Sequence, residues 1–411
     1  MEINQFRIEN IIEALSGFND TPGNGITRYS YSENDLAAKN YLFKIFDKLN
    51  LKVSEDAAGN IRARYEGKKP DLSPILIGSH IDSVGNGGKY DGVAGVAAAI
   101  EVIRVLAENN YIPKRSIEII IFAEEEGSNF GTTMVGSKVL TGKLNTEELK
   151  KLKNFENRSC YEVLKSLGHN PEDAANDKVS KNDIFAVIEL HIEQGIILER
   201  ENKRIGIVDT ISGMKSLKIN IEGVSNHAGA TPMSMRQDPL VAAAEFIGSI
   251  EKAAKYYFTP TTVATVGAID CFPNMPNVIP RSVTFTVDIR DVEQSGVDKM
   301  LEFISKEQNY ITYRHNVYSS YEIVGESQCI RLSEKISDII EKTAKAVNAP
   351  YIRLNSGAVH DSAMFAQLTE VGMIFVPSRG GKSHNAEEFT ECEDISLGCK
   401  VLLNTVIELA N

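Results

Sequence analysis

The chain has 411 residues, more than a single hydrophobic core usually organises, so two domains are expected. Acidic residues outnumber basic ones by 56 to 44, and the resulting net charge of −12 argues against non-specific nucleic-acid binding. No apolar stretch is long enough to cross a membrane. The N-terminus lacks the pattern of a signal peptide and the five cysteines are scattered, so the sequence predicts a cytoplasmic protein with reduced thiols.

The first part of the chain alternates predicted helices and strands. Apolar residues recur on one helical face over 34–49, where Ser32 is placed to cap a helix. Apolar runs over 74–78 and 116–123 indicate buried strands, with a helix over 93–109 between them. Further strands are expected over 51–53, 61–65 and 184–190, and surface helices in the polar stretch 140–181. This alternation predicts an α/β fold with a mainly parallel sheet covered by helices.

The pattern changes after about residue 211. Residues 215–222 and 282–288 alternate apolar and polar side chains, as half-exposed strands do, and a long apolar helix over 240–254 lies between them. These features indicate a smaller α+β unit whose sheet is open on one side. The first pattern then returns in a helix, a strand and a final helix, expected over 330–347, 372–376 and 396–409.

The order of these elements predicts an interrupted domain. Residues 1–211 and 324–411 would form the α/β domain, which carries the candidate metal ligands described below. Residues 212–323 would form the inserted α+β domain. An inserted domain with an open sheet edge is also compatible with dimerisation through that edge.

Histidines and carboxylates follow several of the predicted core strands, at the ends where open α/β sheets usually bind ligands. They are His80, Asp82, Asp91, Glu124, Glu125, Glu126, His191 and His384. Each is ambiguous alone: Asp91 could cap the helix that follows it, and the three glutamates could be a solvated charge run. Together they suit two divalent ions, with one carboxylate shared between them and a spare one acting as general base.

At this point the residues resemble a known family, the metal-dependent amidohydrolases of the M20 peptidase superfamily. The resemblance is to the ureido-cleaving branch, which contains N-carbamoyl-L-amino acid hydrolases, allantoate amidohydrolases and β-ureidopropionases. It spans nearly the whole chain in matching order and rests on Gly-Ser-His-Ile-Asp-Ser (78–83), Glu-Leu-His-Ile-Glu-Gln-Gly (189–195), His-Ala-Gly-Ala-Thr-Pro-Met (227–233) and Ser-His-Asn (383–385). It implies a metallopeptidase-like catalytic domain, an inserted lid and dimerisation domain, and a homodimer.

The resemblance also implies a role for individual residues. The implied metal ligands are His80, Asp91, Glu126, His191 and His384, with Asp91 bridging two divalent ions, zinc or manganese, although cobalt and nickel are also compatible. Glu125 matches the general base, and Asp82 would orient His80. The implied substrate contacts are Gln194, His227, Asn277, Arg290, Ala358 and His360. Arg290 would hold a substrate carboxylate, while His227 and Asn277 would hold the carbonyl oxygen or the carboxylate, and those from the inserted domain would reach an active site, typically that of the partner subunit.

The implied reaction is hydrolysis of the ureido C–N bond of a small carboxylate substrate by a water that two metal ions activate. The substrate would be an N-carbamoyl-L-amino acid or allantoate. Two alternatives stay open: an aminoacylase or dipeptidase of the same superfamily, and a non-catalytic metal-binding scaffold, against which Glu125 beside a full ligand set argues. Departures from the family pattern at Asn129, Ala230, Val359 and Ala386 keep the ligands and the base but leave the substrate preference open.

Overall fold

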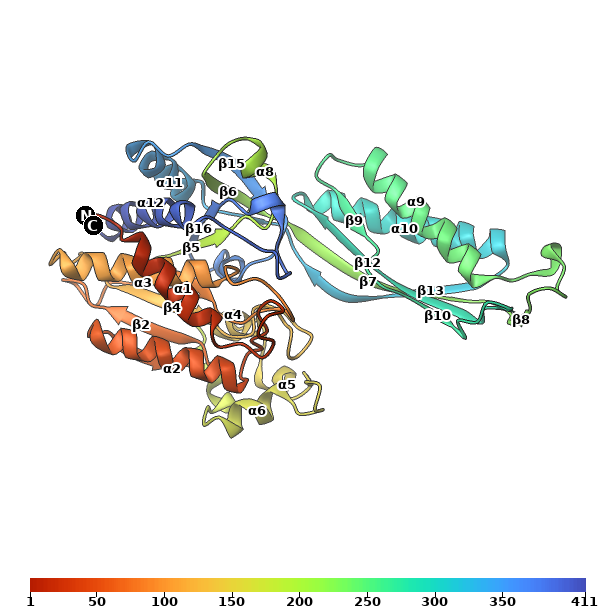
Figure 1. The fold of residues 1–411 in the computed structure, drawn as a ribbon, viewed down its shortest axis with the longest axis horizontal. Helices are drawn as coiled ribbons and strands as arrows, with labels where there is room; N and C mark the ends of the chain where they lie inside the picture. Colours follow the sequence, from red (N-terminus) through yellow and green to blue (C-terminus); the bar gives the residue numbers. More distant parts are fainter. The chain divides into compact units, whose positions relative to one another are not determined.

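The computed structural model describes residues 1–411, and the chain divides into two compact units (Figure 1). The first unit contains Met1–Asp209, Arg331–Leu354 and His360–Asn411, and the second contains Thr210–Ile330 and Asn355–Val359. The sequence placed the return to the first unit at residue 324, whereas the structure places it at Arg331. Residues 355–359 join the second unit because they hydrogen-bond to it, as when the Ser212 hydroxyl donates to the Ser356 carbonyl at 2.6 Å.

The first unit is built on a nine-stranded sheet in the order β1-β2-β4-β3-β5-β16-β6-β14, with β15 paired to β6. The strands are β1 (Lys52–Glu55), β2 (Ile61–Tyr65), β3 (Ile75–His80), β4 (Ile117–Phe122), β5 (Ala186–Ile192), β6 (Ile205–Ile211), β14 (Ile330–Arg331), β15 (Tyr351–Ser356) and β16 (Glu370–Val376). The central strands β4, β3, β5 and β16 are parallel, whereas β2 and β6 pair antiparallel at their flanks. The predicted α/β class is confirmed, and the sheet is mixed, with its parallel part at the centre.

The parallel register brings the carboxyl ends of the central strands to one edge of the sheet. His80 at the end of β3 lies opposite Phe122 at the end of β4, and His191 on β5 lies opposite Phe375 on β16. Both histidines are buried. This edge is where open α/β sheets bind their ligands.

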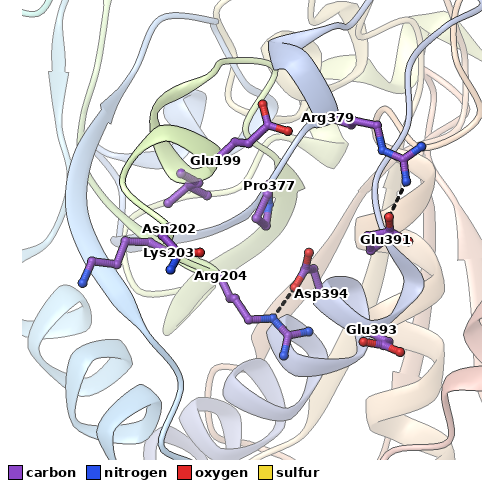
Figure 2. A pocket seen from close by; sticks show the side chains of 10 residues that line it. Glu199, Asn202, Lys203, Arg204, Pro377, Arg379, Glu391, Glu393 and Asp394 are labelled. Carbon is purple, nitrogen blue, oxygen red and sulfur yellow. Dashed lines mark hydrogen bonds and ion pairs between the residues drawn. The ribbon is translucent and has the colours of Figure 1, made fainter.

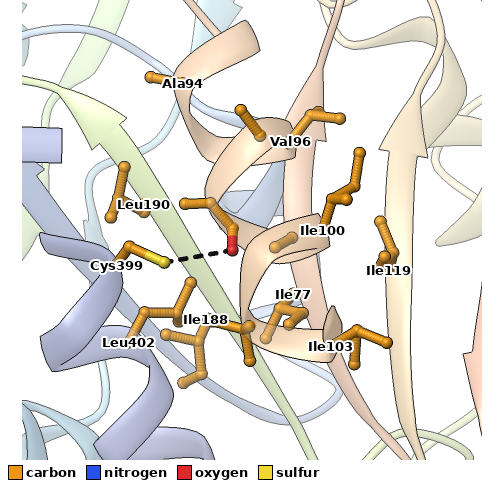
Figure 3. Close-up of a cluster of buried hydrophobic side chains, with 14 of the residues drawn as sticks. Ile77, Ala94, Val96, Ile100, Ile103, Ile119, Ile188, Leu190, Cys399 and Leu402 are labelled. Atoms are coloured by element: carbon orange, nitrogen blue, oxygen red, sulfur yellow. Dashed lines mark hydrogen bonds between the residues drawn. The ribbon is translucent and has the colours of Figure 1, made fainter. Parts of the chain in front are cut away.

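One face of this sheet carries a continuous hydrophobic core. Helices α1 (Gln5–Ser16), α2 (Glu33–Lys48), α3 (Val93–Glu108), α11 (Glu334–Ala346) and α12 (Cys392–Ala410) contribute to it. Figure 1 shows α1, α3 and α12 side by side, and they contact one another. Figure 3 shows Ile100 and Ile103 of α3 together with strand residues such as Ile77 and with side chains of α12, where the Cys399 thiol donates to the Ala98 carbonyl at 3.4 Å. Most residues of helix α3 are buried, because the sheet, α1 and α12 surround it.

The polar stretch 140–181 forms short helices, as predicted. They are α5 (Thr146–Leu149), α6 (Cys160–Ser166), η1 (Pro171–Asp173) and α7 (Ala174–Asp177). The buried helix α4 (Val135–Leu140) precedes this stretch and was not predicted, and later in the chain come α8 (Ile197–Arg200), η3 (Asp361–Phe365) and η4 (Arg379–Gly381). Helices α5 and α6 begin with capping boxes formed by Asn145 and Ser159, which satisfy backbone N–H groups that short helices cannot pair internally.

The second unit is a five-stranded antiparallel sheet in the order β10-β12-β7-β13, with β9 on β12. Its elements are β7 (Gly213–Glu222), β8 (Asn226–His227), η2 (Met233–Met235), α9 (Pro239–Tyr256), β9 (Val263–Thr265), β10 (Ile269–Phe272), β11 (Val278–Ile279), β12 (Ser282–Asp291), α10 (Gln294–His315) and β13 (Tyr318–Ser327). Alternate residues of β12 are buried, and α9 and α10 pack on this apolar face (Figure 1). Strands β8 and β11 form a separate two-stranded ladder.

One predicted helix begins later than expected. The sequence predicted a helix over 330–347, whereas Ile330–Arg331 is strand β14 and the helix begins at Glu334. The Ser333 hydroxyl accepts a hydrogen bond from the Ile336 N–H at 3.3 Å, which starts the helix at that point. None of the helices is both long and apolar enough to span a membrane. The cytoplasmic location stays a prediction.

Candidate metal centre and substrate residues

Three histidines of the first unit converge on Asp91. The Nε2 atoms of His191 and His80 lie 3.1 and 3.6 Å from Asp91 Oδ1, and His384 Nε2 lies 3.3 Å from Asp91 Oδ2. Glu126 Oε2 is 3.4 Å from His384 Nε2. Asp91 therefore belongs to two groups whose possible ligand atoms lie within 4.8 Å of one another, His80–Asp91–His191 and Asp91–Glu126–His384. This is the arrangement that a bridging carboxylate requires.

The electrostatics of the cluster fit divalent cations. Burial raises the pKa of Glu126 to about 7, and burial raises the pKa of Glu125 well above its ordinary range. Burial would also raise the pKa of Asp91, but its hydrogen bonds with His191 and the other two histidines hold it well below its usual value. Glu126 Oε1 is buried without a hydrogen-bond partner, an arrangement that is costly unless a cation satisfies it. Imidazole and carboxylate ligands suit zinc, manganese, cobalt and nickel.

The three consecutive glutamates after β4 have different environments. Glu124 adopts a left-handed backbone conformation, with φ of 52°, and its buried side chain accepts hydrogen bonds from the N–H groups of Asn129 and Phe130 at 2.9 and 2.8 Å. Burial raises the pKa of Glu124 to about 8. Glu125 Oε2 instead lies 3.7 Å from His80 Nε2. The residue types alone could not assign different roles to these glutamates. In the structure the Glu124 side chain hydrogen-bonds to the backbone of the loop that follows it, whereas Glu125 and Glu126 lie beside the histidines.

Asp82 holds the turn that carries these glutamates. Its carboxylate accepts hydrogen bonds from the N–H groups of Glu125 and Glu126 at 3.3 and 3.1 Å. His80 Nδ1 lies 3.1 Å from the Asp82 carbonyl and 3.7 Å from its carboxylate. The nearer contact of His80 is therefore with the backbone of Asp82, because the chain turns immediately after β3. The sequence expectation placed this contact on the carboxylate.

In two of the candidate ligands, His80 and His191, the Nδ1 atom faces a backbone carbonyl. His80 Nδ1 faces the Asp82 carbonyl, and His191 Nδ1 faces the Ile192 carbonyl at 2.9 Å. A carbonyl accepts a hydrogen bond, so the ring proton belongs on Nδ1 in each case. Without a metal, Nε2 of each ring donates to Asp91, and a cation that takes the place of this proton would meet the Nε2 lone pair while Nδ1 keeps its own proton.

Two further predicted residues lie in this part of the structure. Gln194, also left-handed with φ of 56°, donates from Nε2 to Asp91 Oδ2 at 2.7 Å, so its side chain lies at the candidate metal centre. His360 is 2% exposed, and its ring centroid is 4.7 Å from that of His191. His360 therefore packs against the candidate ligand His191, and Glu189 lies close to both histidines.

The second unit positions His227 beside Asn277. Strands β8 and β11 pair His227 with Val278, and the Ala228 N–H donates to the Asn277 carbonyl at 3.0 Å. His227 Nδ1 accepts hydrogen bonds from the N–H groups of Gly229 and Ala230 at 3.0 and 3.1 Å. The ring proton therefore belongs on Nε2, which makes His227 a neutral hydrogen-bond donor in an exposed loop.

The second unit also brings Arg290 to the segment that contains Ala358. Arg290 Nε donates to Asp288 Oδ1 at 2.8 Å, and Nη1 donates to the Gly357 carbonyl at 3.0 Å. Sequence reasoning missed Asp288, although residues two apart on a strand share a face and this spacing could have indicated it. Gly357 lies 67 residues after Arg290 in the sequence, so no short-range sequence pattern could have indicated this contact.

A hollow of about 340 Å³ lies elsewhere in the first unit, between α8 and the loop after β16 (Figure 2). Figure 2 shows that its two arginines are already paired, Arg204 with Asp394 and Arg379 with Glu391. None of the predicted site residues lines this hollow. We therefore place the candidate chemistry at the histidine cluster.

Comparison with known proteins agrees with this geometry. The family model described as Peptidase family M20/M25/M40 matches residues 76–408. The chain therefore belongs to this metal-dependent hydrolase family. Within it, the chain falls in the ureido-cleaving branch, whose members are hydrolases of C–N bonds other than peptide bonds. The family and the enzyme class predicted from the sequence are confirmed.

Individual relatives match over almost their whole length. The N-carbamoyl-L-amino-acid amidohydrolase of Pseudomonas sp. (strain NS671) is 38% identical over 99% of this chain and 98% of its own. The allantoate amidohydrolase of Escherichia coli (strain K12) is 32% identical, with 99% of each chain covered. A crystal structure of a hydantoinase/carbamoylase family amidase from Burkholderia multivorans superposes with a TM-score of 0.91 at 30% identity, covering 100% of this chain and 98% of that one.

Proposed function

We propose that this enzyme hydrolyses the ureido C–N bond of a small carboxylate substrate, an N-carbamoyl-L-amino acid or allantoate. The observation that carries the proposal is the convergence of His80, His191 and His384 on Asp91, with Glu125 beside them. The names of the two relatives above support the substrate class. The higher identity to the first of them favours N-carbamoyl-L-amino acids.

Two divalent cations, zinc or manganese, would be held by His80, Asp91 and His191 and by Asp91, Glu126 and His384. When bound, such ions polarise the substrate carbonyl and lower the pKa of water. Glu125 then accepts a proton from the attacking water at its carboxylate and donates it to the leaving nitrogen. Asp82 keeps the backbone of Glu125 in place, and the carbamoyl group leaves as ammonia and carbon dioxide.

The proposed substrate residues of the second unit would bind the negatively charged oxygens of the substrate, whereas Glu125 transfers the proton. His227 would donate from Nε2 to the oxygen that becomes negative as the carbonyl is attacked, and Asn277 would support it. Arg290 has Nη2 left for a substrate carboxylate after Nε and Nη1 are engaged by Asp288 and Gly357. Ala358 would border this carboxylate site, and Gln194 and His360 would border the reacting group.

A substrate panel tests the proposal. Protein loaded with manganese or zinc is given N-carbamoyl-L-amino acids, N-carbamoyl-β-alanine, allantoate, N-acetyl amino acids and dipeptides, and release of ammonia or free amine is measured. We expect turnover only of the ureido compounds. Turnover confined to N-acetyl compounds or dipeptides would instead identify an aminoacylase or dipeptidase, and no turnover with bound metal would identify a scaffold.

We also propose that the enzyme is a homodimer that associates through the second unit. This unit exposes large apolar side chains on both edge strands of its sheet, Ile269 and Phe272 on β10 and Tyr318 and Ile323 on β13. An exposed apolar edge strand can pair with a strand of another chain. Sedimentation equilibrium is expected to give twice the chain mass of 45.2 kDa. A fully active monomer at all concentrations would contradict the proposal.

A further inference from the structure

Glu388 links two loops that both carry candidate metal ligands. It lies four residues after His384 in the loop between β16 and α12, and it is 5% exposed. Its Oε1 accepts hydrogen bonds from the N–H groups of Tyr90 and Asp91 at 3.0 and 3.1 Å. The carboxylate of Glu388 therefore holds the turn before α3 from a position 297 residues away in the sequence.

The other carboxylate oxygen of Glu388 accepts a hydrogen bond from Ser383, in the loop that carries His384. Ser383 Oγ lies 2.7 Å from Glu388 Oε2 and 3.0 Å from Asp91 Oδ2, so one hydroxyl proton is shared between the two carboxylates. Ser383 directly precedes His384. Asp91 is thus held at its backbone by Glu388 and at its side chain by Ser383, which fixes where both of its oxygens point.

The turn is shaped to receive this carboxylate. A Cβ atom on Gly88 would lie 2.1 Å from both Cδ and Oε1 of Glu388, a distance that no side chain can occupy. Glycine at this position lets the backbone pass directly over the Glu388 side chain. The fit is between two segments far apart in the chain, so it contributes only once the domain has folded.

We infer that Glu388 is a positioning residue that sets the separation of the Asp91 and His384 ligand atoms before a cation binds. The inference rests on the proposed function, because it takes Asp91 and His384 as ligands. Partners that orient metal ligands typically contribute 10–100-fold to metal affinity. Glu388 is expected to act through Asp91 and His384, and it need not touch the substrate.

Metal binding to the metal-free enzyme tests the inference without any substrate. Titration with Zn²⁺ or Mn²⁺ in competition with a chelator is carried out on the wild type and on Glu388→Ala, Glu388→Gln and Glu387→Gln. We expect Glu388→Ala to weaken binding of at least one ion by about 10–100-fold. Glu388→Gln should lose less, because its amide oxygen can still accept from both N–H groups.

Glu387→Gln is the matched control. Glu387 is the neighbouring residue, its side chain is exposed, and its only ion pair is with Lys382. This variant should bind metal as the wild type does. A loss shared equally by Glu387→Gln and Glu388→Ala would show a general effect of charge and would overturn the inference, as would wild-type metal affinity in Glu388→Ala.

Two further readouts separate positioning from a general loss of structure. Hydrogen exchange at the Tyr90 and Asp91 amides should accelerate in metal-free Glu388→Ala and much less in Glu388→Gln, and unchanged exchange would also overturn the inference. At saturating metal, kcat of Glu388→Ala should recover toward that of the wild type. If the metal affinities change as expected while the wild type hydrolyses no ureido compound, the proposed function fails and the inference on Glu388 stands.

Discussion

Replacing Glu125 with Gln is expected to lower kcat on the best ureido substrate by about 10²–10⁴-fold, which is the usual contribution of a general acid–base residue. The amide has the shape of the carboxylate but cannot accept the proton of the attacking water. The metal ions should remain bound, because Glu125 belongs to neither group of possible ligands. Steady-state kinetics together with metal analysis of the purified variant checks both expectations.

Glu126→Gln is the comparison for this variant. Glu126 is the adjacent glutamate, and it belongs to the Asp91–Glu126–His384 group, so its loss should lower metal content as well as turnover. The two variants are then distinguished by metal content alone. A Glu125→Gln enzyme that retains its metals and full turnover would show that the proposed mechanism is wrong.

Replacing Arg290 with Ala is expected to raise KM for carboxylate substrates by about 10–100-fold, since hydrogen bonds to charged groups contribute roughly 1.5–3 kcal/mol. Arg290→Lys should recover little of this loss, because a lysine ammonium cannot keep the contacts of Nε and Nη1 with Asp288 and Gly357 while also binding the substrate carboxylate. The measurement is kcat and KM for an N-carbamoyl amino acid and for its primary amide. The amide should be nearly insensitive to the substitution.

Arg314→Ala provides the control for removing a positive charge from the second unit. Arg314 is exposed on α10 and pairs with Glu245, so its loss should leave KM unchanged. If Arg290→Ala raises KM for the N-carbamoyl amino acid and for its primary amide by the same factor, Arg290 does not recognise the substrate carboxylate.

The elements that sequence periodicity predicted well are those with a strong and uniform pattern. The Ile-rich run became the buried strand β4, and the apolar run around residue 100 became the buried helix α3. The elements that were missed include β6, β15 and α10. Strand β6 pairs antiparallel with β16 across more than 160 residues of sequence, and no local signal reports such a pairing.

The candidate site divides in a similar way. The sequence by itself determined which residue types stand at the ends of the strands, and the order of its motifs was enough to identify the family. These features can be recognised in the amino-acid sequence without the fold. They include the five candidate ligands, the run of three glutamates and the His227 motif.

Only the tertiary structure decided how these residues are used. It separated Glu124, whose carboxylate holds its own loop, from Glu125 and Glu126, and it turned the Nε2 atoms of His80 and His191 toward Asp91. It also brought Glu388 to the backbone of Asp91. The physical reason is that each of these choices depends on hydrogen bonds to backbone groups or on contacts between distant segments, and neither is encoded in the identity or spacing of the residues that make them.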